Sequence, residues 1–362
     1  MAEMASKERL LNAITGKEVD RTPWSPFLAY YWEHQPQEVQ QLGQVQYMRQ
    51  LGADPLLRGF HQLFRTKVHN CDFRTVTKGN KKQDTFETKV GTLQEEYTWS
   101  ATANSWFLTG HSVKTEEDFK TLQYMCENTE VIEYIENFER DYYELGDKGL
   151  YLPVIGLYAK TAFQSLVERW CGTVDLTYAL YDFPEVVEEC LATIQEKDRE
   201  TVRFSLNSPA EGFIFWEDSS TTNVSPDLFA RYTAPQINEW GKMIHAQDRL
   251  LIHHACGLLK HLLPLMAKTE VDMIESVSPP PTGDIEIEDA LAILPQHIGI
   301  IGGIEPTFFE KCTFEELESN VKHLVNGAKG KRFILANSDS CPPGVTHQKF
   351  ELVSKLVHVN HF

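Results

Sequence analysis

Residues 250–265 read LLIHHACGLLKHLLPL: a short apolar run ends in two histidines and a cysteine, then passes through Gly257 into a helical pattern. Helical patterns also follow five further apolar runs, namely LYLPVIG (150–156), GFIFWED (212–218), DMIESV (272–277), IGIIGGI (298–304) and RFILANS (332–338). Strands buried on both faces read as continuous apolar runs, and their alternation with helices is typical of a parallel sheet. The sequence therefore predicts an α/β fold.

Two earlier runs, WSPFLA (24–29) and ADPLLRG (53–59), raise the number of predicted strands to eight. Eight parallel strands are the number in a (β/α)8 TIM barrel. We expect one such domain over residues 1–362, with an N-terminal extension that begins with a helix at 7–15. The alternative is an open doubly wound sheet, but no Gly-x-Gly-x-x-Gly motif follows a strand, which disfavours dinucleotide binding.

Residues 70–113 have a different pattern from the rest of the chain. Polar and apolar residues alternate with period two, and the alternation is interrupted by KGNKK (78–82) and VGT (90–92). Alternation of this kind with turn residues between the runs indicates antiparallel strands. We expect an antiparallel β meander inserted into the barrel at 70–113.

The composition restricts the compartment and the partners. There are 34 Lys and Arg against 52 Asp and Glu, a net charge of −18, which disfavours nucleic acid or an anionic membrane as a partner. No run approaches the roughly 20 apolar residues of a membrane span, and the N-terminus lacks the apolar core of a signal peptide. The seven cysteines are scattered, as is usual in a reducing compartment. We expect a cytoplasmic protein.

The active site of a barrel lies at the carboxyl ends of its strands. His254 and Cys256 are two apart at the end of one predicted strand, so both side chains project to the same side, and His253 projects to the other. Cys341 follows the last strand. One imidazole and two thiolates suit Zn²⁺ with an open fourth position, as in catalytic sites. Plain packing is the alternative for each of these residues.

Further candidates lie at the same predicted edge. Glu275 is a candidate fourth zinc ligand, or else a cap of the following loop. Glu217 and Asp218 are adjacent on a strand and project to opposite faces, so at most one of them addresses the site. Asp218 can orient His254 or hand a proton to a leaving oxygen, with a plain structural role as the alternative, and Asp339 is placed like Asp218. We assign catalytic roles to Glu217, Asp218 and Asp339. Two aromatic residues, Tyr30 and Tyr158, are candidates for the wall of a substrate pocket.

Several motifs together resemble the uroporphyrinogen decarboxylase superfamily: KERLLNAITGKEVDRTP (7–23), SPPPTGD (278–284), the IIGGI strand, and His254-x-Cys256 with the distant Cys341. The last motif resembles the H-x-C…C of the zinc-dependent, corrinoid-linked methyltransferases. This resemblance spans essentially the whole chain.

The resemblance implies zinc bound by His254, Cys256 and Cys341. It implies methyl transfer between a small molecule and the cobalt of a corrinoid on a separate small protein. The small molecule is either a thiol acceptor or a methyl ether, amine or thioether donor. A homodimer is expected from the family as well.

Two rival functions stay open. Uroporphyrinogen decarboxylases are metal-free and carry an Arg-Gln-Ala-Gly-Arg-Tyr stretch that holds propionates, but here residues 24–36 read WSPFLAYYWEHQP, without arginine. That departure disfavours decarboxylation. A non-catalytic scaffold that keeps the barrel is the second rival.

Overall fold

The computed structural model describes residues 3–102 and 104–359, and the chain divides into two compact units. The barrel unit comprises Met1–His61, Glu136–Val154 and Pro209–Phe362, and the second unit comprises Gln62–Ile135 and Ile155–Ser208. The expectation of a single domain over residues 1–362 stays a prediction. Within the described residues, every helix is too short or too polar to cross a membrane.

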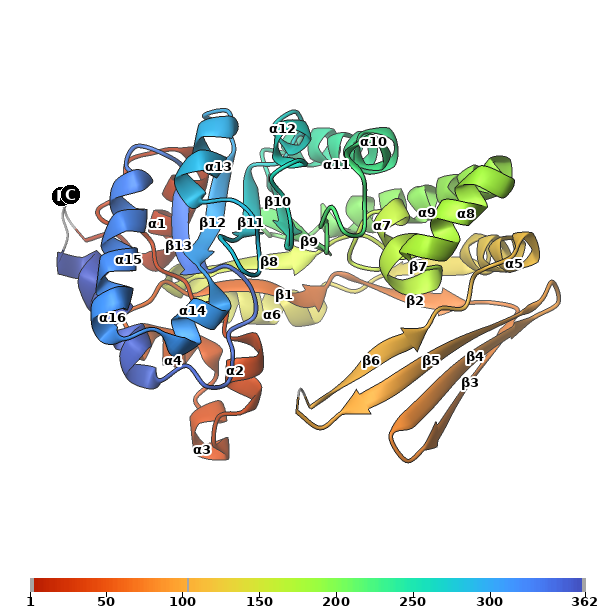
Figure 1. Cartoon of the computed structure of the whole chain (residues 1–362), viewed down its shortest axis with the longest axis horizontal. Coiled ribbons are helices and arrows are strands. Elements are labelled where there is room, and N and C mark those ends of the chain that lie inside the picture. Colours follow the sequence, from red (N-terminus) through yellow and green to blue (C-terminus); the bar gives the residue numbers. More distant parts are fainter. Residues whose placement is uncertain (1–2, 103, 360–362) are drawn as a thin grey trace. The chain divides into compact units, whose positions relative to one another are not determined.

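The barrel unit is built on a seven-stranded sheet with the order β1-β8-β9-β10-β11-β12-β13 (Figure 1). Each of the pairs from β8 to β13 is parallel. The sheet confirms the predicted α/β, TIM-barrel-like fold and all but the first of the predicted strands. Its strands are β1 (Leu56–Gln62), β8 (Leu150–Val154), β9 (Gly212–Glu217), β10 (Leu250–Ala255), β11 (Met273–Val277), β12 (Gly299–Ile304) and β13 (Phe333–Asn337).

The first predicted strand, 24–29, is reduced to one bridging residue. Trp24 pairs in parallel with Leu335 of β13, and its carbonyl oxygen accepts a hydrogen bond from the Asp54 amide (2.7 Å), just before β1. Residues 23–25 thus connect the last strand to the start of the first. Pro23 and Pro26 flank this segment, and because proline has no N–H to donate, the ladder cannot extend.

Helices connect these strands, and α15 and α16 pack against each other beside β12 and β13 (Figure 1). The helices of the barrel unit are α1 (Ser6–Thr15), α2 (Ala29–Glu33), α3 (Gln37–Gln40), α4 (Gln44–Gln50), α6 (Glu136–Leu145), α10 (Pro226–Leu228), α11 (Ala234–His245), α12 (Leu263–Met266), α13 (Ile287–Ile293), α14 (Pro306–Lys311), α15 (Phe314–Gly327) and α16 (His347–Val359).

The second unit contains the predicted meander. Four antiparallel strands in the order β3-β4-β5-β6 confirm it: β3 (Cys71–Lys78), β4 (Lys81–Thr88), β5 (Thr92–Ser100) and β6 (Ser105–Gly110). A separate antiparallel pair joins β2 (Phe64–Val68) to β7 (Thr129–Glu133). The helices of this unit are α5 (Glu116–Glu127), α7 (Ala162–Ser165), α8 (Thr173–Asp182) and α9 (Pro184–Ser205), with a π-helical turn at Leu166–Trp170.

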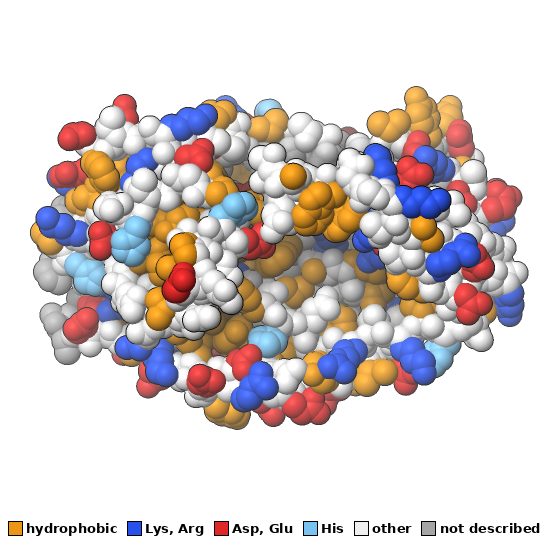
Figure 2. All heavy atoms as spheres, turned by 90° about the horizontal axis from the view of Figure 1, so that it is seen from below, with side chains coloured by type: hydrophobic (Ala, Val, Ile, Leu, Met, Phe, Trp, Pro, Cys, Tyr) orange, Lys and Arg blue, Asp and Glu red, His pale blue; other side chains and the backbone are white. Residues whose placement is uncertain are grey.

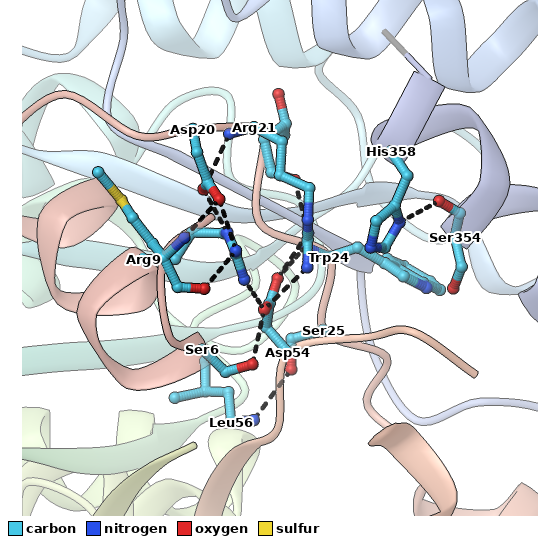
Figure 3. A network of polar contacts seen from close by, with 12 residues as sticks. Ser6, Arg9, Asp20, Arg21, Trp24, Ser25, Asp54, Leu56, Ser354 and His358 are labelled. Atoms are coloured by element: carbon cyan, nitrogen blue, oxygen red, sulfur yellow. Dashed lines mark hydrogen bonds and ion pairs between the residues drawn. The ribbon is translucent and has the colours of Figure 1, made fainter. Parts of the chain in front are cut away.

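A buried network of charges joins α1 to the residues that precede β1 (Figure 3). Arg9 binds Asp20 through Nε (2.6 Å) and Asp54 through Nη1 (2.5 Å). Arg21 binds both oxygens of Asp54, at 2.8 and 3.0 Å. Since these residues lie at the amino ends of the strands, opposite the end that carries chemistry in barrels, we assign the network to stability.

Candidate active site

His254 lies opposite two site residues in the register of the parallel sheet. Its register partners are Trp216 on β9 and Glu275 on β11. Residues paired in register project to the same face of a sheet, so these three side chains are neighbours. All three come from the carboxyl ends of their strands, where the active site was expected.

A chain of polar contacts holds the imidazole of His254. Its Nδ1 lies 2.7 Å from Oε2 of Glu275 and 3.2 Å from Oγ of Ser276. The other oxygen of Glu275 lies 2.9 Å from Nη1 of Arg58, and Arg58 donates from Nη2 to the carbonyl oxygen of Ser25 (2.8 Å). Arg58, Glu275 and His254 are all buried. Nδ1 is therefore engaged, and Nε2 is the nitrogen left for a ligand.

The charges of Arg58, Glu275 and His254 shift the pKa values of these residues. Burial by itself lowers the pKa of His254, but the Glu275 carboxylate and the contact with Cys256 outweigh burial and raise that pKa well above its usual value. Burial alone raises the pKa of Glu275, but the charges of Arg58 and His254 hold it below its usual value. The carboxylate of Glu275 is therefore ionised, and an ionised carboxylate offsets the buried charge of Arg58.

Cys256 lies close to His254. The two side chains are close enough for each to shift the pKa of the other, and the sulfur also lies 3.8 Å from the carbonyl oxygen of Glu217. Burial raises the pKa of the Cys256 thiol, His254 lowers it, and the carboxylates of Asp339 and Asp218 raise it further. An imidazole and a thiol thus meet at the strand ends, with two carboxylates near the sulfur.

Cys341 does not join this pair. Its side chain is fully buried, and burial followed by the charge of Glu310 raises its pKa. Its backbone is fixed: the Cys341 N–H donates to the Phe27 carbonyl oxygen (3.1 Å), and its carbonyl oxygen accepts from the Tyr31 N–H (2.9 Å). In the described residues, 3–102 and 104–359, no group of three His, Cys, Asp or Glu side chains converges so as to hold a metal ion. Among the described residues, His254 and Cys256 therefore lie together, and Cys341 does not form a group of three with them.

The predicted acidic residues have different environments. Glu217 is buried on the opposite face of β9, where its Oε2 lies 3.1 Å from Nε2 of His253 and accepts from Ser219 Oγ (3.2 Å). Asp218 is half-buried and accepts from Nδ2 of Asn223 (2.7 Å). Asp339 is half-buried beyond β13. The carboxylates of Asp218 and Asp339 raise the pKa of the Cys256 thiol. Glu217 instead contacts His253 on the opposite face of the sheet.

Glu275 lies on the Nδ1 side of His254 with both oxygens engaged. It orients His254, which is the role that the sequence suggested for Asp218. The sequence analysis did not identify Arg58, the partner of Glu275. A signal was present: an arginine inside the apolar run ADPLLRG is expected to be buried, and a buried charge needs a carboxylate partner.

The aromatic residues beside His254 are Phe27 and Trp216. Their ring centroids lie 6.2 and 6.1 Å from that of His254, and both side chains are half-buried. Of the aromatics predicted instead, Tyr30 is exposed. Tyr158 belongs to the second unit, where its ring packs on Trp170 at 5.4 Å.

A parallel barrel whose polar side chains gather at the carboxyl ends of the strands is an enzyme scaffold. The chain belongs to the uroporphyrinogen decarboxylase (URO-D) family, whose model matches residues 153–359. Curated relatives named uroporphyrinogen decarboxylase come from Synechococcus sp. (strain CC9605), 24% identical over 173 residues, and Parasynechococcus marenigrum (strain WH8102), 25% identical over 170 residues. These matches cover 46% of this chain and 46% and 45% of the relatives, so the chain spans about half the length of the curated relatives it matches.

Among solved structures, the fold is similar to that of a methyltransferase from Methanosarcina mazei. The TM-score is 0.64 at 11% identity, and the match covers 99% of both chains. At this identity the likeness shows a shared fold.

Proposed function

We propose that this protein is a zinc-dependent methyltransferase that moves a methyl group between a small molecule and the cobalt of a separate corrinoid protein. The small molecule is a thiol acceptor or a methyl ether, amine or thioether donor. The observation that carries this proposal is the contact of His254 with Cys256, with Glu275 on Nδ1 of the imidazole. A carboxylate on the far nitrogen is the usual second partner of a histidine that binds zinc.

His254 through Nε2 and Cys256 through its sulfur are the residues that would hold the metal. When bound, zinc supplies a Lewis acid that makes a thiol lose its proton or polarises a methylated atom. Cys341 is kept as the third ligand in this proposal, although its thiol lies apart from the pair in the present arrangement.

The chain's own residues supply the other requirements of methyl transfer. Glu275 and Arg58 fix the orientation of the imidazole. Asp218 and Asp339, half-buried near Cys256, can accept the proton of a substrate thiol or protonate a leaving oxygen. Phe27 and Trp216 provide apolar walls that keep water from the reacting atoms.

Decarboxylation of a porphyrinogen, the rival function, needs cationic groups for several carboxylates. Arg58, the buried arginine beside His254, is already engaged by Glu275 and by the carbonyl oxygen of Ser25. This arrangement favours methyl transfer over decarboxylation.

The test combines metal analysis with cobalt spectroscopy. We expect about one zinc per chain, loss of that zinc in Cys256→Ser, and retention in Cys190→Ser, a buried cysteine of the second unit. Mixing the protein with a methylated corrinoid protein and a panel of thiols, and with the demethylated form and a panel of methyl donors, should change the cobalt absorbance in one of the two directions. Protein that contains no zinc and leaves the cobalt spectrum unchanged, but releases carbon dioxide from uroporphyrinogen, would establish the rival function.

A further inference from the structure

Helix α8 of the second unit carries an apolar stripe that faces solvent. The exposed fractions of Val174, Tyr178 and Tyr181 are 66%, 65% and 86%. Spacings of four and three residues place the three side chains on one face of the helix. The opposite face of α8 buries Leu176 and Ala179, and α8 packs against α9 (Figure 1). We call the three exposed side chains the α8 stripe.

The sequence around the α8 stripe is strongly acidic. Residues 173–189, TVDLTYALYDFPEVVEE, contain no Lys or Arg, and their five acidic residues are Asp175, Asp182, Glu185, Glu188 and Glu189. On the face drawn in Figure 2, Lys and Arg (blue) lie scattered among Asp and Glu (red). The α8 stripe therefore combines exposed aromatic surface with a chain segment, 173–189, whose own Asp, Glu, Lys and Arg residues are all acidic.

Large exposed tyrosines with a charged surround are typical of the centres of protein interfaces, where tyrosine is among the residues that contribute most to binding. The acidic surround selects the partner, since complementary charge steers association and like charge opposes it. Two copies of α8 facing each other would bring two such acidic segments together, and an anionic membrane would repel this face. The chemistry fits a protein with an apolar pocket bordered by Lys and Arg.

We propose that the α8 stripe is a docking surface for a basic protein partner. Resting on the proposed function, that partner is the corrinoid protein, because it is the protein with which the proposed reaction exchanges a methyl group. Tyr178 and Tyr181 fill the apolar pocket of the partner, and Asp182 and Glu185 contact its basic border.

The experiment compares two sources of the same methyl group. Tyr178→Ser/Tyr181→Ser and the wild type are assayed for methyl transfer to a thiol acceptor from the methylated corrinoid protein and from free methylcobalamin, which needs no docking surface. We expect the KM for the corrinoid protein to rise about tenfold or more, as for loss of two central tyrosines, and the rate with free methylcobalamin to stay within about twofold. The matched control is Tyr143→Ser on α6 of the barrel unit, whose side chain is 69% exposed, and we expect it to leave both values unchanged.

Two results overturn the docking proposal while the enzyme remains a methyltransferase. One is an unchanged KM for the corrinoid protein in the double variant. The other is a wild-type dimer in sedimentation velocity that the double variant dissociates, since a second copy would then cover the stripe. A wild type that transfers methyl from neither source to a thiol, and from no methyl donor to the demethylated corrinoid protein or to free cobalamin, instead refutes the proposed function, so the two failures are distinguishable.

Discussion

At the scale of single residues, Glu275 has the most demanding position in the site. Its two oxygens face Arg58 and His254, and all three residues are buried. Removing one member of a buried ion pair leaves the other charge without compensation, which costs more than the pair itself contributes. We therefore expect Glu275→Gln to lower the free energy of unfolding by about 3 kcal/mol or more, measured by chemical denaturation.

Glu318→Gln is the control for this prediction, because Glu318 binds Lys322 on the exposed surface of α15. Exposed pairs contribute little to stability, so we expect almost no change in the control. If the two substitutions lowered the free energy of unfolding equally, the Arg58–Glu275 pair would not have the effect on stability that we assign to it.

A second residue-scale prediction concerns pH. Burial by itself would raise the pKa of Asp20, but hydrogen bonds from Arg9 and from the Met4 N–H outweigh it and hold the pKa at about 2 instead of 3.8. A lowered folded-state pKa stabilises the protein above pH 3.8, and this contribution is lost as pH falls through about 2. The side chain of Asp20 is 9% exposed, so the contribution is about 2 kcal/mol.

Asp20→Asn tests this assignment through the pH dependence of stability. Above pH 4 the variant should be less stable than the wild type, and the difference should shrink between pH 4 and pH 2 as the wild type loses its advantage. Denaturant titrations at several pH values give both curves. Parallel curves over that interval would mean that Asp20 does not titrate with a lowered pKa.

At the scale of elements, the contact of the Trp216 side chain on β9 with the backbone of β1 depends on a glycine. Gly59 has φ +69°, and a Cβ there would overlap the indole of Trp216. Gly79, in a turn of the meander, also has a positive φ (+59°), but open space surrounds it. We expect Gly79→Ala to cost about 1 kcal/mol of backbone strain and Gly59→Ala about 3 kcal/mol, because overpacking is added.

Denaturation of the two glycine variants isolates the clash as the difference between them. We also expect the tryptophan emission of Gly59→Ala to shift, since the indole of Trp216 must move, and that of Gly79→Ala to stay as in the wild type. If both substitutions lower the free energy of unfolding equally, the indole of Trp216 can move away from Gly59 without loss of stability. The position of this indole beside His254 is then not fixed by packing.

Most elements could be predicted from the sequence because their signals are local. Continuous apolar runs located β8 to β13, and period-two alternation located the meander. The pairing of His254 with Cys256 followed from the side-chain alternation of one strand. The local sequence also contained the signal that reduces the predicted strand 24–29 to a single bridge at Trp24, namely Pro23 and Pro26.

The remainder of the site depends on contacts between distant residues. Arg58 and Glu275 are 217 positions apart (275 − 58), and although an arginine in an apolar run indicates that a carboxylate is needed, nothing near Arg58 in sequence indicates which carboxylate it is. The direction of the Cys341 side chain depends on backbone hydrogen bonds to Phe27 and Tyr31, more than 300 positions away. Strand periodicity places residues at an edge of a sheet, but tertiary packing decides which of them meet.

At the scale of the whole molecule, the two units differ in how their strands are covered. Every residue of β11, β12 and β13 is buried, whereas seven of the eight residues of β3 are exposed. β3 is also an edge strand of its sheet, while β4 has neighbours on both sides. Buried strands open only with global unfolding, and exposed edges open locally at small cost. Hydrogen exchange followed by mass spectrometry should therefore label 71–78 first, 81–88 later, and 273–277, 299–304 and 333–337 last, by orders of magnitude. Protection of 71–78 equal to that of 299–304 would contradict this order, because it would require something to cover the edge of the meander in solution.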